Sequence, residues 1–333
     1  MSKTTAAITA VGKYLPEYIL TNQILETMVD TNDEWITTRT GIKERRILKD
    51  DGKGSSFMAI HAANDLIDKS KLDPKEIDLV IVASATPDMQ AASTAAFVAY
   101  KIGASNAFSF DVDSACSSFL YGISIASSYI ESGKYKKILL IGADKNSSMI
   151  DYDDRATCII FGDGAGAVLF EENHEGFGVQ DEYLRTNGEG REFLQVKIGG
   201  SSYPYKKGDV VGENAGSFVH QEGRTVFKNA VFNMADVSEK IMSRNGLSNE
   251  SVSWLAAHQA NKRIIDATAE RMNLDTSKVM MNIDRYGNTT SATLPLLLAD
   301  YENQLQKGDN IIFAAFGGGF SWGAIYLKWA YNS

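Results

Sequence analysis

The feature that most constrains the fold is an internal repeat at a nearly constant spacing. Three successive stretches resemble three later ones: DLVIVASAT (78–86) resembles SWLAAH (253–258), FDVDSACSSFLYGI (110–123) resembles NIDRYGNTTSATLPL (282–296), and KKILLIG (136–142) resembles DNIIFAAFGG (309–318). The first two offsets are 172 residues and the third is 173, and this alignment sets Cys116 against Asn288. Repetition at one offset predicts two similar halves that arose by duplication.

Continuous apolar runs alternate with helical patterns along the chain. Residues 76–84, 136–142 and 310–316 are apolar at most positions, which is typical of strands buried on both faces of a sheet. Apolar residues recur at helical spacing in four stretches: 55–69, 93–100, 225–243 and 261–272. We therefore predict an α/β fold whose sheets are covered by helices on both faces.

Four further segments complete the outline. Residues 6–11 and 278–283 are predicted as strands, and residues 156–170 (ATCIIFGDGAGAVLF) as a strand, the glycine turn GDGAGA (162–167) and a second strand. This turn lacks the Lys-Ser/Thr of a phosphate loop, so we interpret its glycines as allowing close backbone packing. Residues 171–222 show little regularity and are predicted to form a surface excursion around an entrance.

Length, charge and cysteine content bound the function. A chain of 333 residues has room for about two domains, or for one domain built from two halves. Its net charge of −9 argues against general attraction to nucleic acid or anionic membranes, and no apolar run approaches the roughly 20 residues of a membrane helix. With two cysteines and no export segment, the chain is expected in the cytoplasm with free thiols. No histidine has a partner at metal-ligand spacing, so no metal site is expected.

Cys116 lies where an apolar strand (108–112) turns into an amphipathic helix that ends at Gly133. The unpaired N–H groups and the dipole of a first helical turn stabilise a thiolate, so this position predicts a lowered thiol pKa and a nucleophile. The alternative is a small buried cysteine. In the repeat, Cys116, His258 and Asn288 each follow a predicted strand, where α/β sheets collect their chemistry, and this favours the nucleophile. Cys158, between apolar neighbours, is interpreted as a core residue.

Residues 30–46 (DTNDEWITTRTGIKERR) are too polar for a core. Trp35 with Arg39, Arg45 and Arg46 offers a flat ring and guanidinium groups, which suit a purine ring and phosphates. The alternative is a solvated loop with one anchoring tryptophan, and the residues by themselves favour it.

The motifs together resemble the β-ketoacyl-acyl carrier protein synthase III family of the thiolase-like superfamily. The resemblance covers the whole chain through DTNDEWITTRTGI, SACSSF, IIFGDGAGA, HQANKRI, RYGNTTSAT and AFGGGFSWG. Thiolases carry a second catalytic cysteine near the C-terminus, where this chain reads GGGFSWG, and the elongating synthases use two histidines. Cys116, His258 and Asn288 match the initiating, type III pattern, whereas the cysteine signature of papain-like proteases is absent.

The resemblance implies a duplicated, five-layered αβαβα fold. Its N-terminal half (1–175) would carry Cys116, and its C-terminal half (176–333) would carry His258 and Asn288. It also implies the initiating condensing enzyme of type II fatty acid synthesis, a homodimer that transfers an acyl group from acyl-CoA to Cys116. Condensation with malonyl-acyl carrier protein then releases CO2. Acyl-CoA is a substrate, and no cofactor is expected.

The resemblance also implies roles for single residues. The main chains of Cys116 and Gly318 would form an oxyanion hole, Phe316 would shield the site, and His258 with Asn288 would stabilise an enolate. The residues implied in CoA binding are Thr31, Trp35, Arg39, Arg155 and Asn261. Those implied in carrier binding are Arg263, Lys228, Lys262 and Arg271, with a solvated face as the alternative for Lys262.

Some positions depart from the family pattern. Ala91 and Ala92 stand where a Phe-Pro pair usually closes the acyl pocket from the partner subunit, which predicts acceptance of starters longer than acetyl. Ser118 replaces a glycine and is expected to trim the space beside the acyl-enzyme. The segment of residues 200–222 is longer and richer in tyrosine than is usual in the family, and Gln221 stands where the family often has a methionine. A ketosynthase of a secondary pathway remains an alternative; a non-catalytic carrier-binding subunit is disfavoured because Cys116, His258 and Asn288 are all present.

Overall fold

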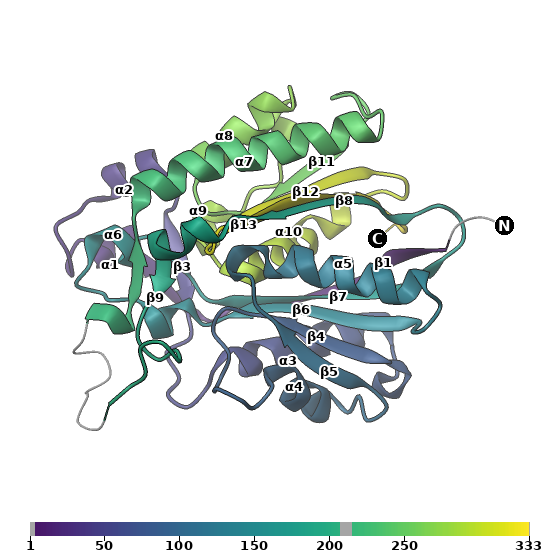
Figure 1. Cartoon of the computed structure of the whole chain (residues 1–333), viewed down its shortest axis with the longest axis horizontal. Helices are drawn as coiled ribbons and strands as arrows, with labels where there is room; N and C mark the ends of the chain where they lie inside the picture. Colours follow the sequence, from purple (N-terminus) through teal and green to yellow (C-terminus); the bar gives the residue numbers. More distant parts are fainter. Residues whose placement is uncertain (1–3, 207–214, 333) are drawn as a thin grey trace.

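The computed structural model describes residues 4–206 and 215–332, which form five layers (Figure 1). Two β-sheets alternate with three layers of helices, one between the sheets and one on each outer face (Figure 1). The predicted αβαβα arrangement is therefore confirmed.

The first sheet has the strand order β1-β7-β6-β4-β5. Its strands are β1 (Thr5–Tyr14), β4 (Leu79–Ala83), β5 (Phe108–Val112), β6 (Lys137–Asp144) and β7 (Gly164–Asn173). β4 runs parallel to β5 and β6, whereas β7 is antiparallel to β6 and β1. All of β4 is buried because helices cover both faces of the sheet.

The second sheet repeats this topology with the order β11-β12-β13-β8. Its strands are β8 (Gly178–Thr186), β11 (Trp254–Ala257), β12 (Asn310–Gly317) and β13 (Ser321–Lys328). β11 is parallel to β12, and β13 is antiparallel to β12 and β8. A parallel bridge between Leu255 and Val279 stands where the first sheet has β5. This shared topology supports the predicted duplication, while the limits 1–175 and 176–333 stay a prediction.

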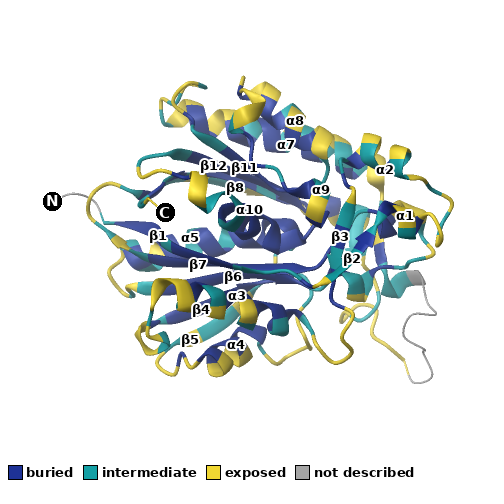
Figure 2. Ribbon diagram, turned by 180° about the vertical axis from the view of Figure 1, so that it is seen from behind, coloured by how far each residue is buried: buried dark blue, intermediate teal, exposed yellow. Residues whose placement is uncertain are grey.

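The helices fall into three pairs: α3 (Ser55–Ser70) with α4 (Thr94–Ile102), α5 (Ser118–Glu131) with α10 (Thr293–Tyr301), and α7 (Gly223–Arg244) with α8 (Lys262–Arg271). α5 and α10 lie between the sheets, and their apolar residues join strands of both sheets in one core cluster. Figure 2 shows these central layers as buried and the outer helices as exposed on one side. Their sequences follow this difference, since only the outer helices need a polar face.

Short elements gather at one end of the layers (Figure 1). They are β2 (Tyr18–Thr21), α1 (Asn22–Leu25), α2 (Asp33–Thr40), β3 (Glu44–Ile47), α6 (Arg155–Cys158), β9 (Leu194–Val196), β10 (Val219–Gln221) and α9 (Ile283–Tyr286). α2 begins where the Asn32 side chain accepts a hydrogen bond from Trp35 N, and it ends at Gly41, whose φ is 83°.

Three predicted segments differ in the structure. Residues 155–158 form α6 rather than a strand, and residues 278–283 contribute only the bridge at Val279 before α9 begins. Apolar runs of this length do not distinguish a strand from another buried segment. Residues 171–222 include the nine-residue strand β8, so this stretch is not wholly an excursion. Part of the 200–222 segment lies outside the described residues.

The close packing predicted for the glycines of GDGAGA and the core position predicted for Cys158 are confirmed, but the predicted turn is wrong because residues 164–167 belong to β7. A side chain at Gly166 would lie 2.7 Å from Pro295 Cβ, and one at Gly164 would lie 3.1 Å from Leu296 Cδ1. The glycines therefore let β7 pack closely against α10. Cys158 is 1% exposed and belongs to an apolar core cluster.

The turns before the two central helices show how the halves correspond. Each helix follows a 3₁₀ turn, Ala115–Ser117 before α5 and Thr290–Ala292 before α10. The first residue of each turn has a positive φ, 49° at Ala115 and 51° at Thr290. Because these turns are 175 residues apart, Cys116 corresponds to Ser291. The sequence alignment of Cys116 with Asn288 is thus wrong by three residues, since α9 lengthens the second half locally.

Candidate active site

Cys116 lies in the 3₁₀ turn between β5 and α5 and is 7% exposed. The end of β12 packs directly against this turn, because a side chain on Gly317 would lie 2.7 Å from Cys116 N. Glycine at this position therefore brings the main chain of residues 317–318 beside the thiol.

The predicted lowering of the Cys116 pKa is wrong. Burial, with a smaller contribution from the carboxylate of Asp144, raises the pKa of the thiol to about 12. Hydrogen bonds from the backbone and from Thr290 act in the opposite direction but are outweighed. The thiol is therefore protonated at neutral pH in the ligand-free protein.

His258 follows β11, and its backbone N–H donates to Ala314 O at 2.8 Å. The side chain is fully buried, and neither ring nitrogen has a hydrogen-bond partner among the residues that the structure describes. Burial lowers the pKa of His258 to about 3, so its ring is neutral at pH 7. A neutral imidazole with unpaired nitrogens has one donor and one acceptor available to a ligand.

Asn288 is held through its main chain and its side chain. Its N–H donates to Ile160 O at 2.9 Å, and its carbonyl accepts from Gly162 N at 3.0 Å. Its Oδ1 accepts a hydrogen bond from Thr290 N at 2.9 Å. This contact fixes the orientation of the amide, with Nδ2 on the side away from Thr290 N.

One cavity of about 510 Å³ connects these residues with the surface. We call it the entrance cavity. Its buried end is lined by Cys116, His258, Asn288 and Phe316, and its exposed end by Trp35, Arg39, Arg224, Asn261 and Arg263. Phe316 is 4% exposed and packs against Phe320 with ring centroids 4.9 Å apart. The structure thus brings the three predicted catalytic residues and Phe316 together.

A second cavity of about 590 Å³ lies on the other side of Cys116, and we call it the far cavity. Its lining includes Met149, Val196, Val219, Gly318 and Phe320. Cys116, Phe161 and Leu194 line both cavities. Cys116 therefore stands between an entrance and a mostly apolar space.

Trp35 is flanked by two arginines at the exposed end of the entrance cavity. The guanidinium carbons of Arg39 and Arg155 lie 4.9 Å and 5.3 Å from its ring centroid. If Trp35 and Arg155 sandwich the adenine ring of CoA, as the resemblance implies, the ring must fit between them. The two groups must then stand about 7 Å apart, which is twice a carbon contact distance of about 3.5 Å. Arg155 must move outward for such a sandwich, which would break its hydrogen bond of 2.8 Å to Asp30 O.

The other residues implied in CoA binding differ in their engagement. Thr31 Oγ1 is buried without a hydrogen-bond partner in the described part of the chain. The Asn261 side chain caps α8 by accepting from Arg263 N at 2.9 Å and also donates to Arg39 O at 2.9 Å.

Arg45 and Arg46 do not serve the entrance cavity, contrary to the prediction that their guanidinium groups suit phosphates. Arg45 is 0% exposed because β3 directs it into the core. Arg46 Nη1 donates to Pro16 O at 3.4 Å, and neither arginine lines the cavity.

The carrier-binding candidates fall into two kinds. Lys262 and Arg271 are paired with Asp266 and Glu239, each at 2.7 Å. Arg263 instead lies 4.9 Å from the Phe227 ring and lines the entrance cavity, and Lys228 is exposed on α7. Charge available to an acidic partner is therefore concentrated at Arg263 and Lys228.

The departures from the family pattern lie in three environments. Ala91 and Ala92 are exposed and line neither cavity of their own chain; Ala91 has a φ of 70°. The Ser118 hydroxyl donates to Ala115 O at 2.6 Å and accepts from Ser114 N at 2.7 Å, and its expected trimming of the space beside the acyl-enzyme stays a prediction. Gln221 lines the entrance cavity.

Sequence reasoning did not identify two residues at the site. Arg224, in the first turn of α7, is exposed at the mouth of the entrance cavity. Thr290 interacts with the Cys116 thiol and lies in the motif RYGNTTSAT, which was the available signal.

Comparisons with known proteins agree along the chain. Residues 110–188 match the family described as 3-Oxoacyl-[acyl-carrier-protein (ACP)] synthase III, and residues 242–329 match its C terminal counterpart. The Beta-ketoacyl-[acyl-carrier-protein] synthase III 2 of Bacteroides thetaiotaomicron is 54% identical over 332 residues, covering 100% of this chain and 98% of the relative.

Two crystal structures have a similar fold. The 3-oxoacyl-[acyl-carrier-protein] synthase III of Aquifex aeolicus VF5 is 40% identical with a TM-score of 0.89, over 97% of this chain and 100% of that one. The priming β-ketosynthase of the R1128 polyketide biosynthetic pathway is 28% identical with a TM-score of 0.89, over 98% and 97%. No helix in the described residues is long and apolar enough to cross a membrane.

Proposed function

The chain belongs to the β-ketoacyl-[acyl-carrier-protein] synthase III family, and on this premise we propose that it initiates type II fatty acid synthesis. It transfers an acyl group from acyl-CoA to Cys116 and condenses it with malonyl-acyl carrier protein, giving 3-oxoacyl-acyl carrier protein and CO2. The observation that carries this proposal is the entrance cavity, whose buried end is lined by Cys116, His258 and Asn288.

In the first half-reaction, the Cys116 sulfur attacks the thioester carbonyl and the CoA sulfur leaves. The thiol proton ends on the departing CoA thiolate, which balances the step. Negative charge develops on the carbonyl oxygen, and the N–H groups of Cys116 and Gly318 are the proposed donors to it. The close approach of the Gly317 main chain to Cys116 N supports this pair.

In the second half-reaction, the malonyl thioester loses CO2 and becomes an enolate. Its carbon attacks the acyl-cysteine carbonyl, and the Cys116 thiolate leaves. One N–H of neutral His258 and Nδ2 of Asn288 stabilise the enolate oxygen. Asn288 has no useful basicity at neutral pH, so charge stabilisation is the role that suits it. Phe316 shields the enolate from water.

Substrates enter from the exposed end of the entrance cavity. Trp35 and Arg155 stack on adenine after Arg155 moves outward, and Thr31, Arg39 and Asn261 hold the rest of CoA. The carrier protein, which is acidic, docks on Arg263 and Lys228, while Lys262 and Arg271 contribute less because they are already paired. Acyl-CoA is consumed as a substrate, and the reaction uses no further cofactor or metal.

The acyl group extends from Cys116 into the far cavity. Its lining is mostly apolar, and its volume of about 590 Å³ exceeds what an acetyl group fills. A partner subunit brings Ala91 and Ala92 to the end of this space, where their small side chains leave room for longer starters.

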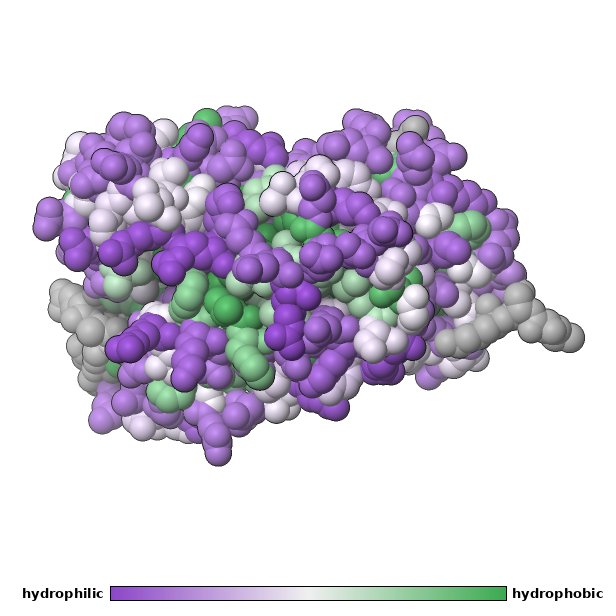
Figure 3. Space-filling view, turned by 90° about the horizontal axis from the view of Figure 1, so that it is seen from above, coloured by the Kyte–Doolittle hydropathy of each residue, from purple (hydrophilic) through white to green (hydrophobic). Residues whose placement is uncertain are grey.

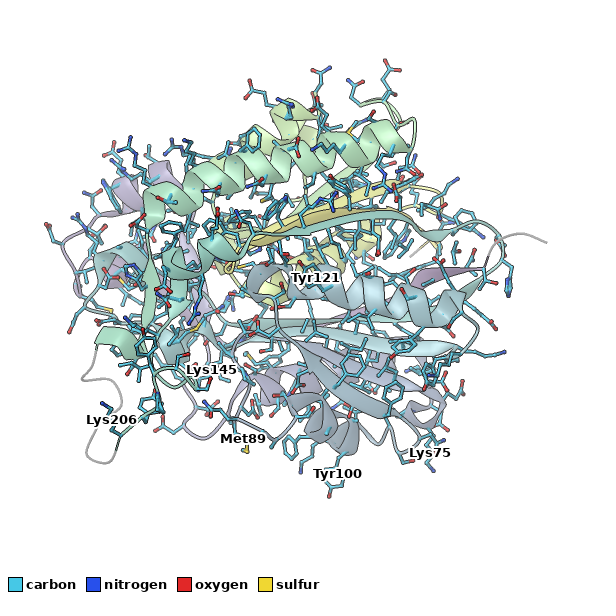
Figure 4. All side chains as sticks on the ribbon, in the orientation of Figure 1. Lys75, Met89, Tyr100, Tyr121, Lys145 and Lys206 are labelled. Carbon is cyan, nitrogen blue, oxygen red and sulfur yellow. The ribbon has the colours of Figure 1, made fainter. Side chains whose placement is uncertain are left out.

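The enzyme is a cytoplasmic homodimer. β5 is an edge strand, and the exposed aromatic side chains beside it include Phe97, Tyr100 and Phe108, at 45%, 75% and 40% exposure. Tyr100 points outward from α4 (Figure 4). An exposed edge with aromatic side chains favours pairing with a second copy. Both cysteines are free, which suits a reducing compartment.

A priming enzyme of a secondary pathway is the second candidate, favoured by the similarity to the R1128 priming β-ketosynthase. The higher identity to the Bacteroides relative favours fatty acid synthesis. A competition among acetyl-, isobutyryl-, hexanoyl- and benzoyl-CoA separates the two, because a dedicated secondary enzyme selects one unusual starter.

The test of the proposed function follows both half-reactions by mass spectrometry. Acyl-CoA should add one acyl group to the Cys116 peptide and leave Cys158 unmodified, and malonyl-acyl carrier protein should then release CO2. Cys116→Ala should fold without either reaction. Asn288→Ala should still be acylated but lose about 100- to 1,000-fold in decarboxylation. Acylation of Cys158, or carrier binding without any acyl transfer, would contradict the proposal.

A further inference from the structure

Arg45 is the largest charged side chain in the protein interior. It lies on β3, is 0% exposed, and forms no ion pair with a carboxylate within residues 4–206 and 215–332. Burial lowers its pKa to about 10, so the guanidinium stays protonated at neutral pH. A buried charge without a counter-charge is costly, so the hydrogen bonds that it makes indicate its role.

We propose that Arg45 is a positioning residue for Asn288. It anchors residues 159–162, whose main chain in turn holds Asn288 in the entrance cavity. This inference rests on the proposed function, because its test separates the two half-reactions.

The first link between Arg45 and Asn288 is a pair of hydrogen bonds from the guanidinium group to one carbonyl oxygen. Arg45 Nε donates to Ile159 O at 3.1 Å, and Nη2 donates to the same oxygen. Two N–H groups from one rigid plane fix the direction of that carbonyl better than a single flexible donor does.

The second contact links the anchored segment to Asn288. Ile160 O accepts from Asn288 N, Gly162 N donates to Asn288 O, and a parallel bridge joins Phe161 with Asn288. The main chain of Asn288 is thus paired on both sides with the residues that follow Ile159. Asn146 supports the same segment, since its Nδ2 donates to Gly162 O at 2.6 Å.

Two glycines make room for the alkyl part of Arg45. A side chain on Gly287 would lie 3.0 Å from Arg45 Cγ and 2.7 Å from Ile160 O, and one on Gly162 would lie 3.2 Å from Arg45 Cβ and clash with Tyr286 O. Gly287 also has a φ of 64°, which glycine adopts readily. Arg45 therefore packs against both segments that meet at Asn288.

A third contact of Arg45 connects it, through Asn22, to α2. Arg45 Nη1 donates to Asn22 Oδ1 at 2.6 Å, and Asn22 Nδ2 donates to Asp33 Oδ1 at 2.7 Å. The hydrogen bonds through Asn22 therefore form one arm, which connects Arg45 to the helix that carries Trp35. The hydrogen bonds to Ile159 O form a second arm, which connects Arg45 to Asn288. The two arms are separable by substitution.

The test compares Arg45→Gln with Arg45→Met. Both are neutral and similar in length, but Gln has an amide nitrogen where Arg45 has Nε, so only Gln can still donate to Ile159 O. We expect Arg45→Met to be acylated within about threefold of the wild-type rate and to condense about 10- to 100-fold more slowly, because small misplacement of a catalytic group has effects of this size. Arg45→Gln should condense about tenfold faster than Arg45→Met.

A second readout reports on the main chain. Hydrogen–deuterium exchange of the peptide that contains Asn288 should be faster in Arg45→Met than in Arg45→Gln. Arg46→Met is the matched control on the same strand and should keep the wild-type ratio of the two rates. If Arg45→Met does not fold, Arg45→Leu replaces it, because Leu is also apolar and has no N–H group that could donate to Ile159 O.

Equal losses in both half-reactions, or equal condensation by the Gln and Met variants, would overturn the positioning role. A wild-type protein that does not condense would instead contradict the proposed function, so the two failures are distinguishable.

Discussion

At Cys116, the helix terminus and the burial of the thiol act in opposite directions on the pKa. The backbone N–H of Cys116 and the Thr290 hydroxyl favour the thiolate, whereas removal from water and the Asp144 carboxylate favour the thiol. Asp144 is itself fully buried, and burial raises its pKa to about 6 although its carboxylate accepts from Ala85 N and Ser291 N at 2.8 Å. Burial is the larger effect at Cys116, so the resting site contains a thiol and, at His258, a neutral imidazole.

This balance predicts how Cys116 reacts with iodoacetamide. An acid with a raised pKa keeps its proton to higher pH, and with a pKa of about 12 the thiolate fraction rises about tenfold per pH unit through neutrality and beyond. The alkylation rate should therefore rise about tenfold from pH 7 to 8 and again from 8 to 9. Peptide mass spectrometry measures this rate, with a short unstructured cysteine peptide in the same tube as a control that levels off above its pKa of about 8.5. A plateau at Cys116 below pH 9 would show that burial does not dominate.

At the scale of elements, α7 and α8 form the face seen from above in Figure 3, where apolar side chains lie among hydrophilic ones. Arg263 lies in the first turn of α8 and lines the entrance cavity, whereas Arg271 ends the same helix in an ion pair with Glu239. Two arginines on one helix thus differ in their availability to an acidic partner.

We predict that Arg263→Glu raises the KM for malonyl-acyl carrier protein about three- to tenfold, because it reverses a charge at the exposed end of the entrance cavity, where the acidic carrier docks. Acyl transfer from acyl-CoA should change less. Arg271→Glu is the matched control and should have the smaller effect on the carrier KM. The loss caused by Arg263→Glu should shrink at high salt, which screens charges at the surface. Equal losses with carrier and acyl-CoA would mean that Arg263 mainly supports CoA.

The elements also show what the sequence can predict. β4, β6 and β12 were predictable because continuous burial leaves an apolar run, and α5 because its apolar residues face two sheets. The conformation of residues 156–161 was not predictable, because Ile159 and Phe161 are buried in a core cluster without belonging to a strand. Apolar character records burial and only indirectly the backbone conformation.

The same reasoning applies to the site. Cys116, His258 and Asn288 could be identified because their motifs and order are specific, and the structure places them on one cavity. The raised pKa of Cys116 and the burial of Arg45 could not be predicted from the sequence. Both depend on how deeply segments distant in sequence cover these two side chains. Arg45 stands in a polar stretch that reads as surface, yet its partners Ile159 and Asn22 enclose it.

At the scale of the whole molecule, the exposed aromatic edge predicts a dimer. The mass in solution should be twice the 36.4 kDa of one chain. Replacing Phe97 and Tyr100 together by Glu should shift the protein toward the monomer, because both side chains are exposed and a charge there opposes burial. Phe232→Glu is the control, since Phe232 is 67% exposed on α7. Light scattering measures the masses, and a monomeric wild type would contradict the proposed assembly.

The dimer also bears on the choice of acyl starter. Each methylene buried in the far cavity contributes about 0.8 kcal/mol, which is about fourfold per carbon in a competition. We therefore predict that butyryl- and hexanoyl-CoA compete successfully with acetyl-CoA for Cys116, as measured by the masses of the acylated protein.

Two variants locate the end of the acyl space. Val196 lines the far cavity of its own chain, so Val196→Phe should shift the preference toward acetyl whether or not the protein is a dimer. Ala91 lines neither the entrance cavity nor the far cavity of its own chain. Ala91→Phe should therefore produce the same shift only if the partner subunit places this loop at the end of the cavity. If acetyl-CoA is preferred by the wild type and Ala91→Phe leaves the ratio unchanged, the space is closed by other residues and Ala91 does not select the starter.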